Sequence, residues 1–250
     1  MSAEVNAVVC LSGGLDSCVT LYEALAREGA VAALHFTYGQ RTSAREREAF
    51  DAICDHAGVR ERLAVEQPAL RAIGGSALTD TSLEVPTTDP RAAMPTTDAA
   101  VPTTESDAAT PPTDPGDAIP ITYVPFRNGQ ILSVACAWAE ALGATAVYVG
   151  AVEEDSSGYP DCRQEFFEAF ARAVDAGTRP DTRIRIETPV LHRDKAGIVR
   201  RGTELDAPLH LTWSCYTESD VACGTCESCR LRLRGFERAG VFDPIPYRDK

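Results

Sequence analysis

Short apolar runs alternate with segments of helical periodicity along most of the chain. The apolar runs predict buried strands at residues 5–11, 31–36, 60–65, 146–151 and 183–187. Between them, apolar residues recur every three to four positions, which predicts helices at residues 16–27, 41–56, 129–142 and 163–176. Strands separated by helices are typical of a parallel sheet with crossover connections. We therefore expect an α/β fold with a parallel five-stranded sheet and helices on both faces.

Residues 86–120 interrupt this pattern with a proline-rich segment of low complexity. It holds eight of the sixteen prolines of the chain and almost no large apolar side chains. Such a segment cannot bury enough surface to offset the entropy lost on ordering. We expect a disordered insertion within a single α/β domain that spans residues 1–250, with a lid over a site as the alternative.

The net charge and the apolar run near the N-terminus argue against two classes of protein, nucleic-acid-binding and membrane-spanning. The formal net charge of the 250 residues is -13, which argues against a nucleic-acid groove as the main surface, so no direct nucleic-acid binding is expected. The apolar run at residues 5–11 is too short for a signal peptide or a membrane span, so we expect a cytoplasmic protein without membrane contact. Lys195 and Lys250 are the only lysines among 24 basic residues, which makes Lys195 conspicuous.

A glycine turn joins the first predicted strand to the first predicted helix. Gly13 and Gly14 permit close backbone approach, and Ser12 and Ser17 supply hydroxyl groups, so the turn and the helix N-terminus suit a phosphate. The stretch lacks both the Lys-Ser/Thr pair of a Walker loop and the third glycine of a dinucleotide fingerprint. Asp16 would repel phosphates unless a cation lay between them, which indicates Mg²⁺; a helix N-cap is the alternative for this residue.

Polar clusters follow several of the predicted strands. They occupy residues 12–17, 38–41, 153–163 and 191–195. Because ligands of parallel sheets bind beyond the carboxyl ends of the strands, these clusters are expected to converge on one site.

Four cysteines near the end of the chain predict a metal site. Cys215, Cys223, Cys226 and Cys229 follow the spacing C-x7-C-x2-C-x2-C, within a predicted zinc-binding segment at residues 210–240. We expect one structural zinc ion, with an iron–sulfur cluster as the rival. The other five cysteines lie in apolar or helical contexts, where a buried, inert thiol is the default; of these, only Cys162 falls in a polar cluster.

The motifs together resemble a known family. "SGGLDS" resembles the pyrophosphate-binding loop of the PP-loop ATP pyrophosphatase superfamily, which has an adenine nucleotide alpha hydrolase-like, Rossmann-like fold. With "YGQR", "SALTD", "VPFRN", "GYPDCR" and "TWSCY…CGTCESC", the chain resembles the QueC family from Val5 to about Phe236, apart from the insertion. It departs from the family at Thr42, Phe126 and Gln164, where histidine, glycine and proline are usual.

The resemblance implies a ligase that uses ATP to convert 7-carboxy-7-deazaguanine and ammonia to a nitrile, on the route to queuosine or archaeosine. It implies that Asp16 holds the Mg²⁺ of ATP and that Lys195 stabilises the charge that develops on the leaving group. The alternative for Lys195 is a solvated residue on a helix. The ATP-binding residues implied are Cys10, Leu11, Ser12, Gly13, Gly14, Leu15, Asp16, Ser17, Cys18, Val19 and Thr20. A homodimer is implied only by the family.

Substrate contacts are expected in the remaining polar clusters. The candidates are Tyr38, Gln40, Arg127, Asn128, Asp161 and Arg163. A carboxylate can accept the two adjacent donors of a guanine-like edge, and Asp161 is the candidate, with an N-cap of the following helix as the alternative. Arg127 could pair with a carboxylate or phosphate or be a surface cation, and Asn128 could instead cap a helix. His35 and His192 are expected to be structural.

Two other functions compete with the ligase. A tRNA thiolase of the same superfamily would also adenylate its substrate, but it should bind tRNA, which the acidic composition disfavours. A non-enzymatic zinc module would leave the convergence of polar clusters on a phosphate loop unexplained.

Overall fold

Five parallel strands form the centre of the protein. The computed structural model describes residues 4–87, 119–153 and 158–248. The strand order in the sheet is β3-β2-β1-β4-β5, and each neighbouring pair is parallel. The strands are β1 (Ala7–Cys10), β2 (Val31–Thr37), β3 (Arg62–Glu66), β4 (Ala146–Val149) and β5 (Arg185–Glu187). The predicted α/β class is confirmed, while most of the insertion predicted at residues 86–120 lies outside the described residues.

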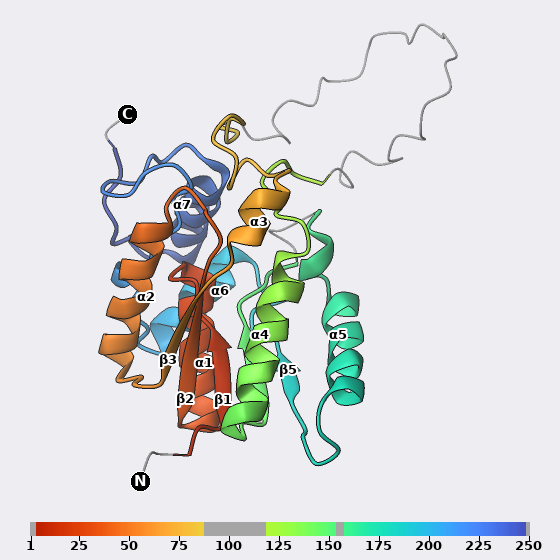
Figure 1. Cartoon of the computed structure of the whole chain (residues 1–250). Helices are drawn as coiled ribbons and strands as arrows, with labels where there is room; N and C mark the ends of the chain where they lie inside the picture. Colours follow the sequence, from red (N-terminus) through yellow and green to blue (C-terminus); the bar gives the residue numbers. More distant parts are fainter. Residues whose placement is uncertain (1–3, 88–118, 154–157, 249–250) are drawn as a thin grey trace, which may run out of the picture.

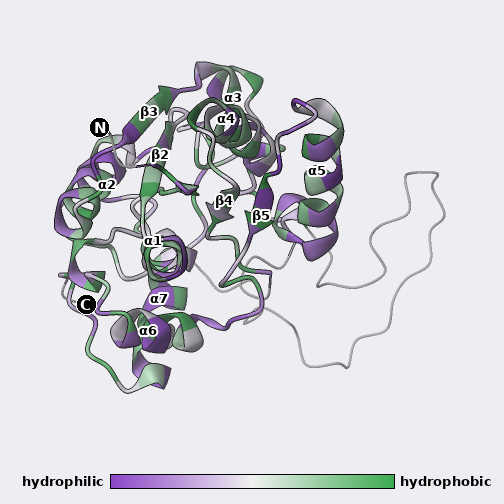
Figure 2. Ribbon diagram, turned by 90° about the horizontal axis from the view of Figure 1, so that it is seen from below, coloured by the Kyte–Doolittle hydropathy of each residue, from purple (hydrophilic) through white to green (hydrophobic). Residues whose placement is uncertain are grey.

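Helices cover both faces of the sheet (Figure 1). Helices α4 (Arg127–Leu142) and α5 (Gln164–Gly177) lie on one face, and α1 (Leu15–Glu28) and α2 (Ser43–Ala57) lie on the other. Figure 2 shows α6 (Lys195–Glu204) and α7 (Glu227–Ala239) beyond α1, as an outer layer. The short helix α3 (Pro68–Ile73) follows β3.

The alternation of side chains along β1 divides the core into two apolar layers. Val8 packs on the face covered by α4 and α5, whereas Ala7 and Val9 pack on the face covered by α1 and α2. Both faces of β1, β2 and β4 are buried, which is why these three strands appear in the sequence as continuous apolar runs.

Helices α3, α6 and α7 were not predicted from the apolar periodicity. In α7 the residues that face inward include Cys229, Arg232 and Gly235 besides Phe236, so the buried side of this helix is hardly apolar. Helix α6 buries Ile198 and Val199 against α1, but its other positions are mostly polar or small. Tertiary contacts, not hydrophobic pattern, define these helices.

A buried ion pair attaches α7 to the end of the chain. The Arg232 guanidinium donates to both carboxylate oxygens of Asp243 at 2.9–3.2 Å, and it also donates to Thr212 Oγ1 and to the Leu209 carbonyl. The Tyr247 hydroxyl donates to the same carboxylate at 2.7 Å. The side chains of Arg232 and Asp243 are only 1% and 5% exposed. Full hydrogen bonding is what makes a charged pair tolerable at this depth.

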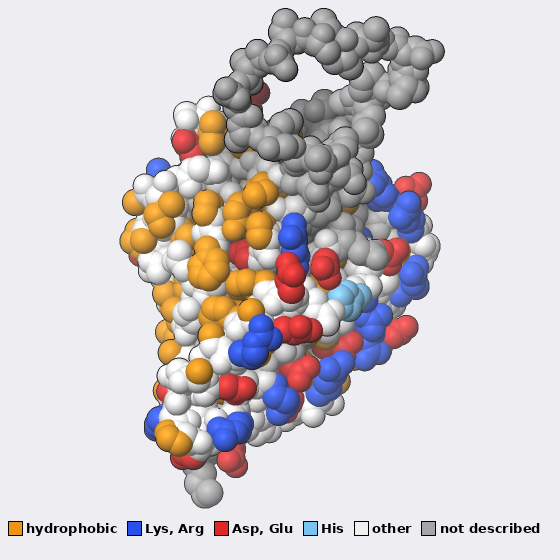
Figure 3. Space-filling model, turned by 90° about the vertical axis from the view of Figure 1, so that its right-hand side faces the viewer, with side chains coloured by type: hydrophobic (Ala, Val, Ile, Leu, Met, Phe, Trp, Pro, Cys, Tyr) orange, Lys and Arg blue, Asp and Glu red, His pale blue; other side chains and the backbone are white. Residues whose placement is uncertain are grey.

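One face of the protein is mixed in charge. On the face shown in Figure 3, acidic and basic side chains are interspersed and do not form a continuous basic area. Among the described residues, no helix combines the length and apolar character that a membrane crossing requires.

We predict that Asp243→Asn lowers the free energy of unfolding by about 3–5 kcal/mol, because it leaves the Arg232 charge buried without a counter-ion. The matched control is Glu218→Gln, which removes the carboxylate of the exposed Arg248–Glu218 pair and should cost about 1 kcal/mol or less. Urea unfolding of both variants measures the difference. Equal losses would show that the buried pair is not a stability determinant.

Candidate active site

A cavity of about 270 Å³ opens at the carboxyl ends of β1, β2 and β4. The first turns of α2 and α4, the turn before α1 and residues 213–216 complete its wall. The polar clusters after the first, second and fourth strands meet here, as the topology predicts. We call this space the main cavity.

The turn between β1 and α1 follows the edge of the main cavity. Gly13 has a φ of 91°, and a Cβ on this residue would lie 2.5 Å from the Glu46 carbonyl oxygen, so only glycine fits. Gly14 occupies the N-cap of α1, and the Ser17 hydroxyl donates to its carbonyl at 3.0 Å. The turn thus places the N-terminus of α1 beside the cavity, an arrangement that suits an anion.

The predicted nucleotide residues divide into two groups. Seven of them line the main cavity: Cys10, Leu11, Ser12, Gly14, Leu15, Asp16 and Ser17. The other four do not line it: Gly13, Cys18, Val19 and Thr20. Cys18 and Val19 pack in the apolar layers under the turn, and the Thr20 hydroxyl donates to the Asp16 carbonyl. This second group supports the turn from behind.

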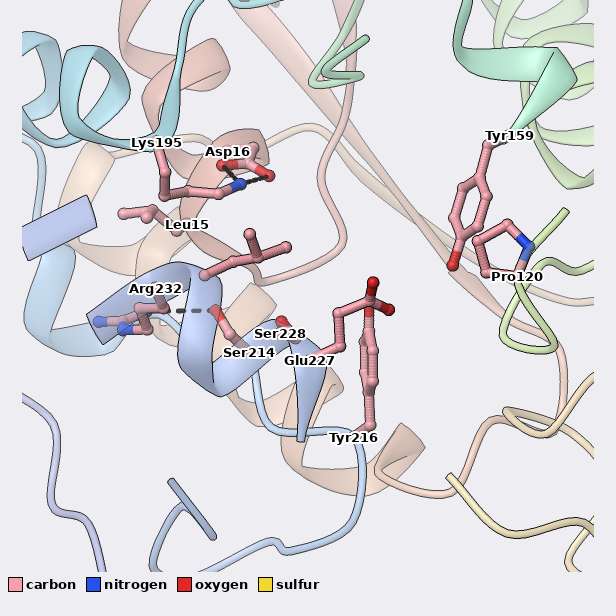
Figure 4. A pocket seen from close by; sticks show the side chains of 11 residues that line it. Leu15, Asp16, Pro120, Tyr159, Lys195, Ser214, Tyr216, Glu227, Ser228 and Arg232 are labelled. Atoms are coloured by element: carbon pink, nitrogen blue, oxygen red, sulfur yellow. Dashed lines mark hydrogen bonds and ion pairs between the residues drawn. The ribbon is translucent and has the colours of Figure 1, made fainter. Parts of the chain in front are cut away.

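Asp16 and Lys195 form an ion pair across two helices. The Lys195 Nζ lies 2.9 Å from each carboxylate oxygen of Asp16 (Figure 4). Asp16 lies in the first turn of α1, after the N-cap Gly14, so the alternative of an N-cap at Asp16 does not apply. Both residues line a hollow of about 100 Å³, the side cavity. It shares six lining residues with the main cavity: Leu15, Asp16, Tyr159, Ser214, Tyr216 and Ser228. Lys195 is therefore part of the site and not a solvated surface residue.

Lys195 is positioned by the contact between α6 and α7. A Cβ at Gly235 of α7 would lie 2.5 Å from Lys195 Cγ and 2.9 Å from Lys195 Cβ. The missing side chain at Gly235 provides the space in which the lysine runs toward Asp16.

A continuous series of hydrogen bonds crosses the main cavity wall from α4 to α2. Arg127 donates to the Tyr38 hydroxyl at 3.0 Å, and its guanidinium lies over the Tyr38 ring. The Tyr38 backbone N–H donates to the Gln40 side-chain oxygen at 2.8 Å, and Gln40 Nε2 donates to Glu46 Oε2 at 3.0 Å. Four side chains that line the cavity are thus held in one arrangement, with a cation at one end and a carboxylate at the other.

Glu46 is a cavity residue that the sequence interpretation missed. The residue is half-buried. Desolvation of its carboxyl group raises its pKa, opposed by hydrogen bonds from Gln40 and Thr42. A signal was present, because Glu46 precedes the buried Ala49, Phe50 and Ile53 by three, four and seven residues on α2. A glutamate on the buried side of a helix indicates a site more often than a random surface charge does.

Three predicted substrate contacts are placed differently from Tyr38, Gln40 and Arg127. Asn128 lines the main cavity, but its backbone N–H donates to Asp161 Oδ2 and its Nδ2 donates to the Asp161 carbonyl, both at 2.8 Å. Asp161 lies behind the cavity wall, where its carboxylate accepts from the first turn of α4, not from the helix that follows it. Its burial raises its pKa. Arg163 is 46% exposed, pairs with Glu165, and does not line the cavity.

The four C-terminal cysteines come together as their spacing predicts. Their Sγ atoms all lie within 4.8 Å of one another, and Cys223 Sγ is 3.9 Å from Cys229 Sγ. A tetrahedral zinc site with Zn–S bonds of about 2.3 Å needs sulfur atoms about 3.8 Å apart, so the arrangement fits. Backbone N–H groups donate to the sulfurs of Cys215 and Cys223 at 3.3–3.4 Å. The cluster could hold a metal ion.

Three buried thiols and the two histidines singled out in the sequence do not line the main cavity. Burial raises the pKa of the Cys18, Cys54 and Cys136 thiols to about 12, so these thiols stay protonated and inert. His35 Nδ1 donates to the Leu11 carbonyl at 3.1 Å, which supports the turn from below. His192 is exposed and contacts Gln164.

Comparison with known proteins gives the family. The family model described as queuosine biosynthesis protein QueC matches residues 6–240. The chain belongs to the QueC family. A relative from Koribacter versatilis named 7-cyano-7-deazaguanine synthase is 50% identical over 244 residues, which cover 97% of this chain and 93% of that protein. A relative of the same name from Nautilia profundicola is 46% identical over 245 residues, or 98% and 99% of the two chains.

Solved structures give a weaker likeness. The U34-tRNA thiolase NcsA from Methanococcus maripaludis, with its 4Fe-4S cluster, aligns with a TM-score of 0.44 and 11% identity. The alignment covers 95% of this chain and 68% of that chain, and it carries no inference about function.

We predict that Gly235→Ala destabilises the protein by about 1–3 kcal/mol, because the added methyl group collides with Lys195 in the α6–α7 contact. The control is Gly177→Ala at the end of α5, where a Cβ meets nothing within 4 Å and the change should be neutral or stabilising. Thermal unfolding measures both. A Gly235→Ala protein as stable as the control would show that the contact is loose.

Proposed function

We propose that this protein is an ATP-dependent ligase that converts 7-carboxy-7-deazaguanine and ammonia to 7-cyano-7-deazaguanine. Identity of 46–50% over nearly the whole chain to proteins named for this product is the observation that carries the proposal. The main cavity supports it, because one continuous wall joins a phosphate-type turn to Tyr38 and Arg127.

The turn and the ion pair are assigned to the nucleotide. Ser12, Gly14 and Ser17 would hold the pyrophosphate part of ATP beside the positive end of α1. Asp16 is the residue that would hold Mg²⁺, which neutralises charge on the phosphates when bound. Lys195 then exchanges the Asp16 carboxylate for phosphate oxygens and stabilises the leaving group.

Two activations at one site account for the chemistry. A carboxylate oxygen is a poor leaving group until it carries AMP, so the first activation forms an acyl adenylate and releases pyrophosphate. Ammonia displaces AMP and gives an amide. A second activation of the amide oxygen allows this oxygen to leave with the transferred group, and loss of two N–H protons gives the nitrile. Arg127 would pair with the carboxylate before the first activation.

We propose zinc as the metal of the cysteine cluster, with a structural role. Four thiolates at tetrahedral spacing leave no open position for a substrate. Trp213 donates its backbone N–H to the Gly13 carbonyl at 2.9 Å, two residues before Cys215, so the cluster also supports the nucleotide turn.

We predict about one zinc ion per chain in colourless purified protein, measured by elemental analysis. Replacing a ligand, as in Cys229→Ser, should abolish zinc binding and lower the melting temperature markedly, because metal binding contributes folding free energy. Cys136→Ala removes a buried thiol from α4 and should keep the zinc. A brown protein that contains iron would overturn the assignment.

We predict that the protein, with ATP, Mg²⁺, ammonium and 7-carboxy-7-deazaguanine, forms the nitrile and releases AMP and pyrophosphate in the first activation. Asp16→Asn should lower turnover by about 100-fold or more, because a bound metal contributes several kcal/mol to the transition state. Product formation followed by chromatography measures both.

The control for this variant is Asp55→Asn, which changes a carboxylate that is 74% exposed at the far end of α2. It should leave turnover unchanged. AMP formation only in the presence of tRNA, with sulfur transferred to the tRNA, would replace the ligase with a thiolase.

A further inference from the structure

The Glu46 carboxylate is fixed in the wall of the main cavity by two neighbours. Thr42 Oγ1 donates to Oε1 at 2.8 Å, and Gln40 Nε2 donates to Oε2 at 3.0 Å. An ionised carboxylate has about four acceptor sites, two on each oxygen. Each oxygen therefore keeps the capacity to accept a further donor.

The surroundings make an added donor favourable. Burial of Glu46 disfavours its charged form, and the Arg127 charge, together with the two hydrogen bonds, only partly opposes this effect. A buried carboxylate is stabilised when donors replace the water it has lost. A ligand that brings two adjacent N–H groups would do so with one donor for each oxygen.

The charges of the main cavity are complementary to those of the substrate of the proposed function. Arg127 supplies a cation at the α4 side, and Glu46 supplies a carboxylate at the α2 side, joined through Tyr38 and Gln40. The substrate has a carboxylate on its five-membered ring and, on its six-membered ring, a ring N–H beside an exocyclic amino group. The carboxylate of the substrate thus matches the Arg127 cation, and its pair of N–H donors matches the Glu46 carboxylate.

We propose that Glu46 reads the guanine-like edge of the substrate, accepting the ring N–H with one oxygen and the exocyclic amino group with the other. This assignment rests on the proposed function. It also replaces the expectation at Asp161, whose carboxylate is engaged by the backbone of α4 behind the cavity wall.

A purely structural role for Glu46 makes a different prediction. If the residue only holds Gln40 and Thr42, its loss weakens every ligand of the main cavity to the same extent. If it reads the edge, its loss removes the distinction between a ligand with the amino group and one without it. Discrimination between two ligands is therefore the measurement that separates the roles.

The experiment measures calorimetric affinities for 7-carboxy-7-deazaguanine and for its analogue that lacks the exocyclic amino group. The wild-type protein should bind the parent at least about tenfold more tightly, because hydrogen bonds to a buried charged group are strong and leaving one unmade is costly. Glu46→Gln should weaken the parent about 10- to 100-fold and bring the ratio of the two affinities close to one. ATP affinity should not change in this variant.

The matched control is Glu48→Gln, two residues along α2, where the side chain is 72% exposed. It should keep both affinities and their ratio. Equal weakening of parent and analogue in Glu46→Gln would overturn the assignment. So would a wild-type ratio near one, a result that needs no variant and stands even if Glu46→Gln does not fold. Failure of the wild-type protein to bind the parent at all would instead reject the proposed function, and this assignment with it.

Discussion

The close backbone approach at Gly13 is the constraint on which the site depends. The turn lies between the carbonyl of Glu46 in α2 and the backbone of Trp213, which donates to the Gly13 carbonyl. No side chain fits at Gly13, so the turn is fixed by backbone atoms on both sides. Two walls of the main cavity, α2 and residues 213–216, meet at this turn, and the Thr42 hydroxyl at the start of α2 also donates to the Cys215 carbonyl at 3.3 Å. The cysteine cluster begins at Cys215, so a structural metal would act on the cavity through the same strip of backbone.

The sheet and its four large helices could be predicted because their signals are local. Apolar runs mark the strands, and apolar residues at helical spacing mark α1, α2, α4 and α5. Helix α7 carries no such signal, because Arg232 occupies one of its most buried positions and finds its partners in Asp243, Thr212 and the carbonyl of Leu209. Such a partner set lies in the folded chain and not in any window of the sequence. The same limit applies to the start of α4, which the apolar periodicity placed at residue 129 and which lies at Arg127.

The candidate site was predictable in part. The spacing of the four cysteines predicted that they cluster, and the end of the first predicted strand located the turn at residues 12–17. Orientation was not predictable, and Asp161 shows why. Its carboxylate follows a strand like the other polar residues, but a short helical turn at Pro160–Cys162 directs it toward α4. Glu46 was missed for the opposite reason. In the sequence it is one of many charged residues in a polar helix, and only the fold shows that it lines the cavity.

The Lys195–Asp16 pair has a consequence for the order in which ligands arrive. The Asp16 carboxylate is already paired with an ammonium group at 2.9 Å. It therefore attracts a free metal ion more weakly than an unpaired carboxylate would. The ammonium leaves readily only if an anion takes its place. A metal ion that arrives together with a polyphosphate satisfies both groups at once, whereas a metal ion alone would strand the lysine. If Asp16 holds the metal of the nucleotide, as proposed, the pair would favour the metal–nucleotide complex over a free divalent ion.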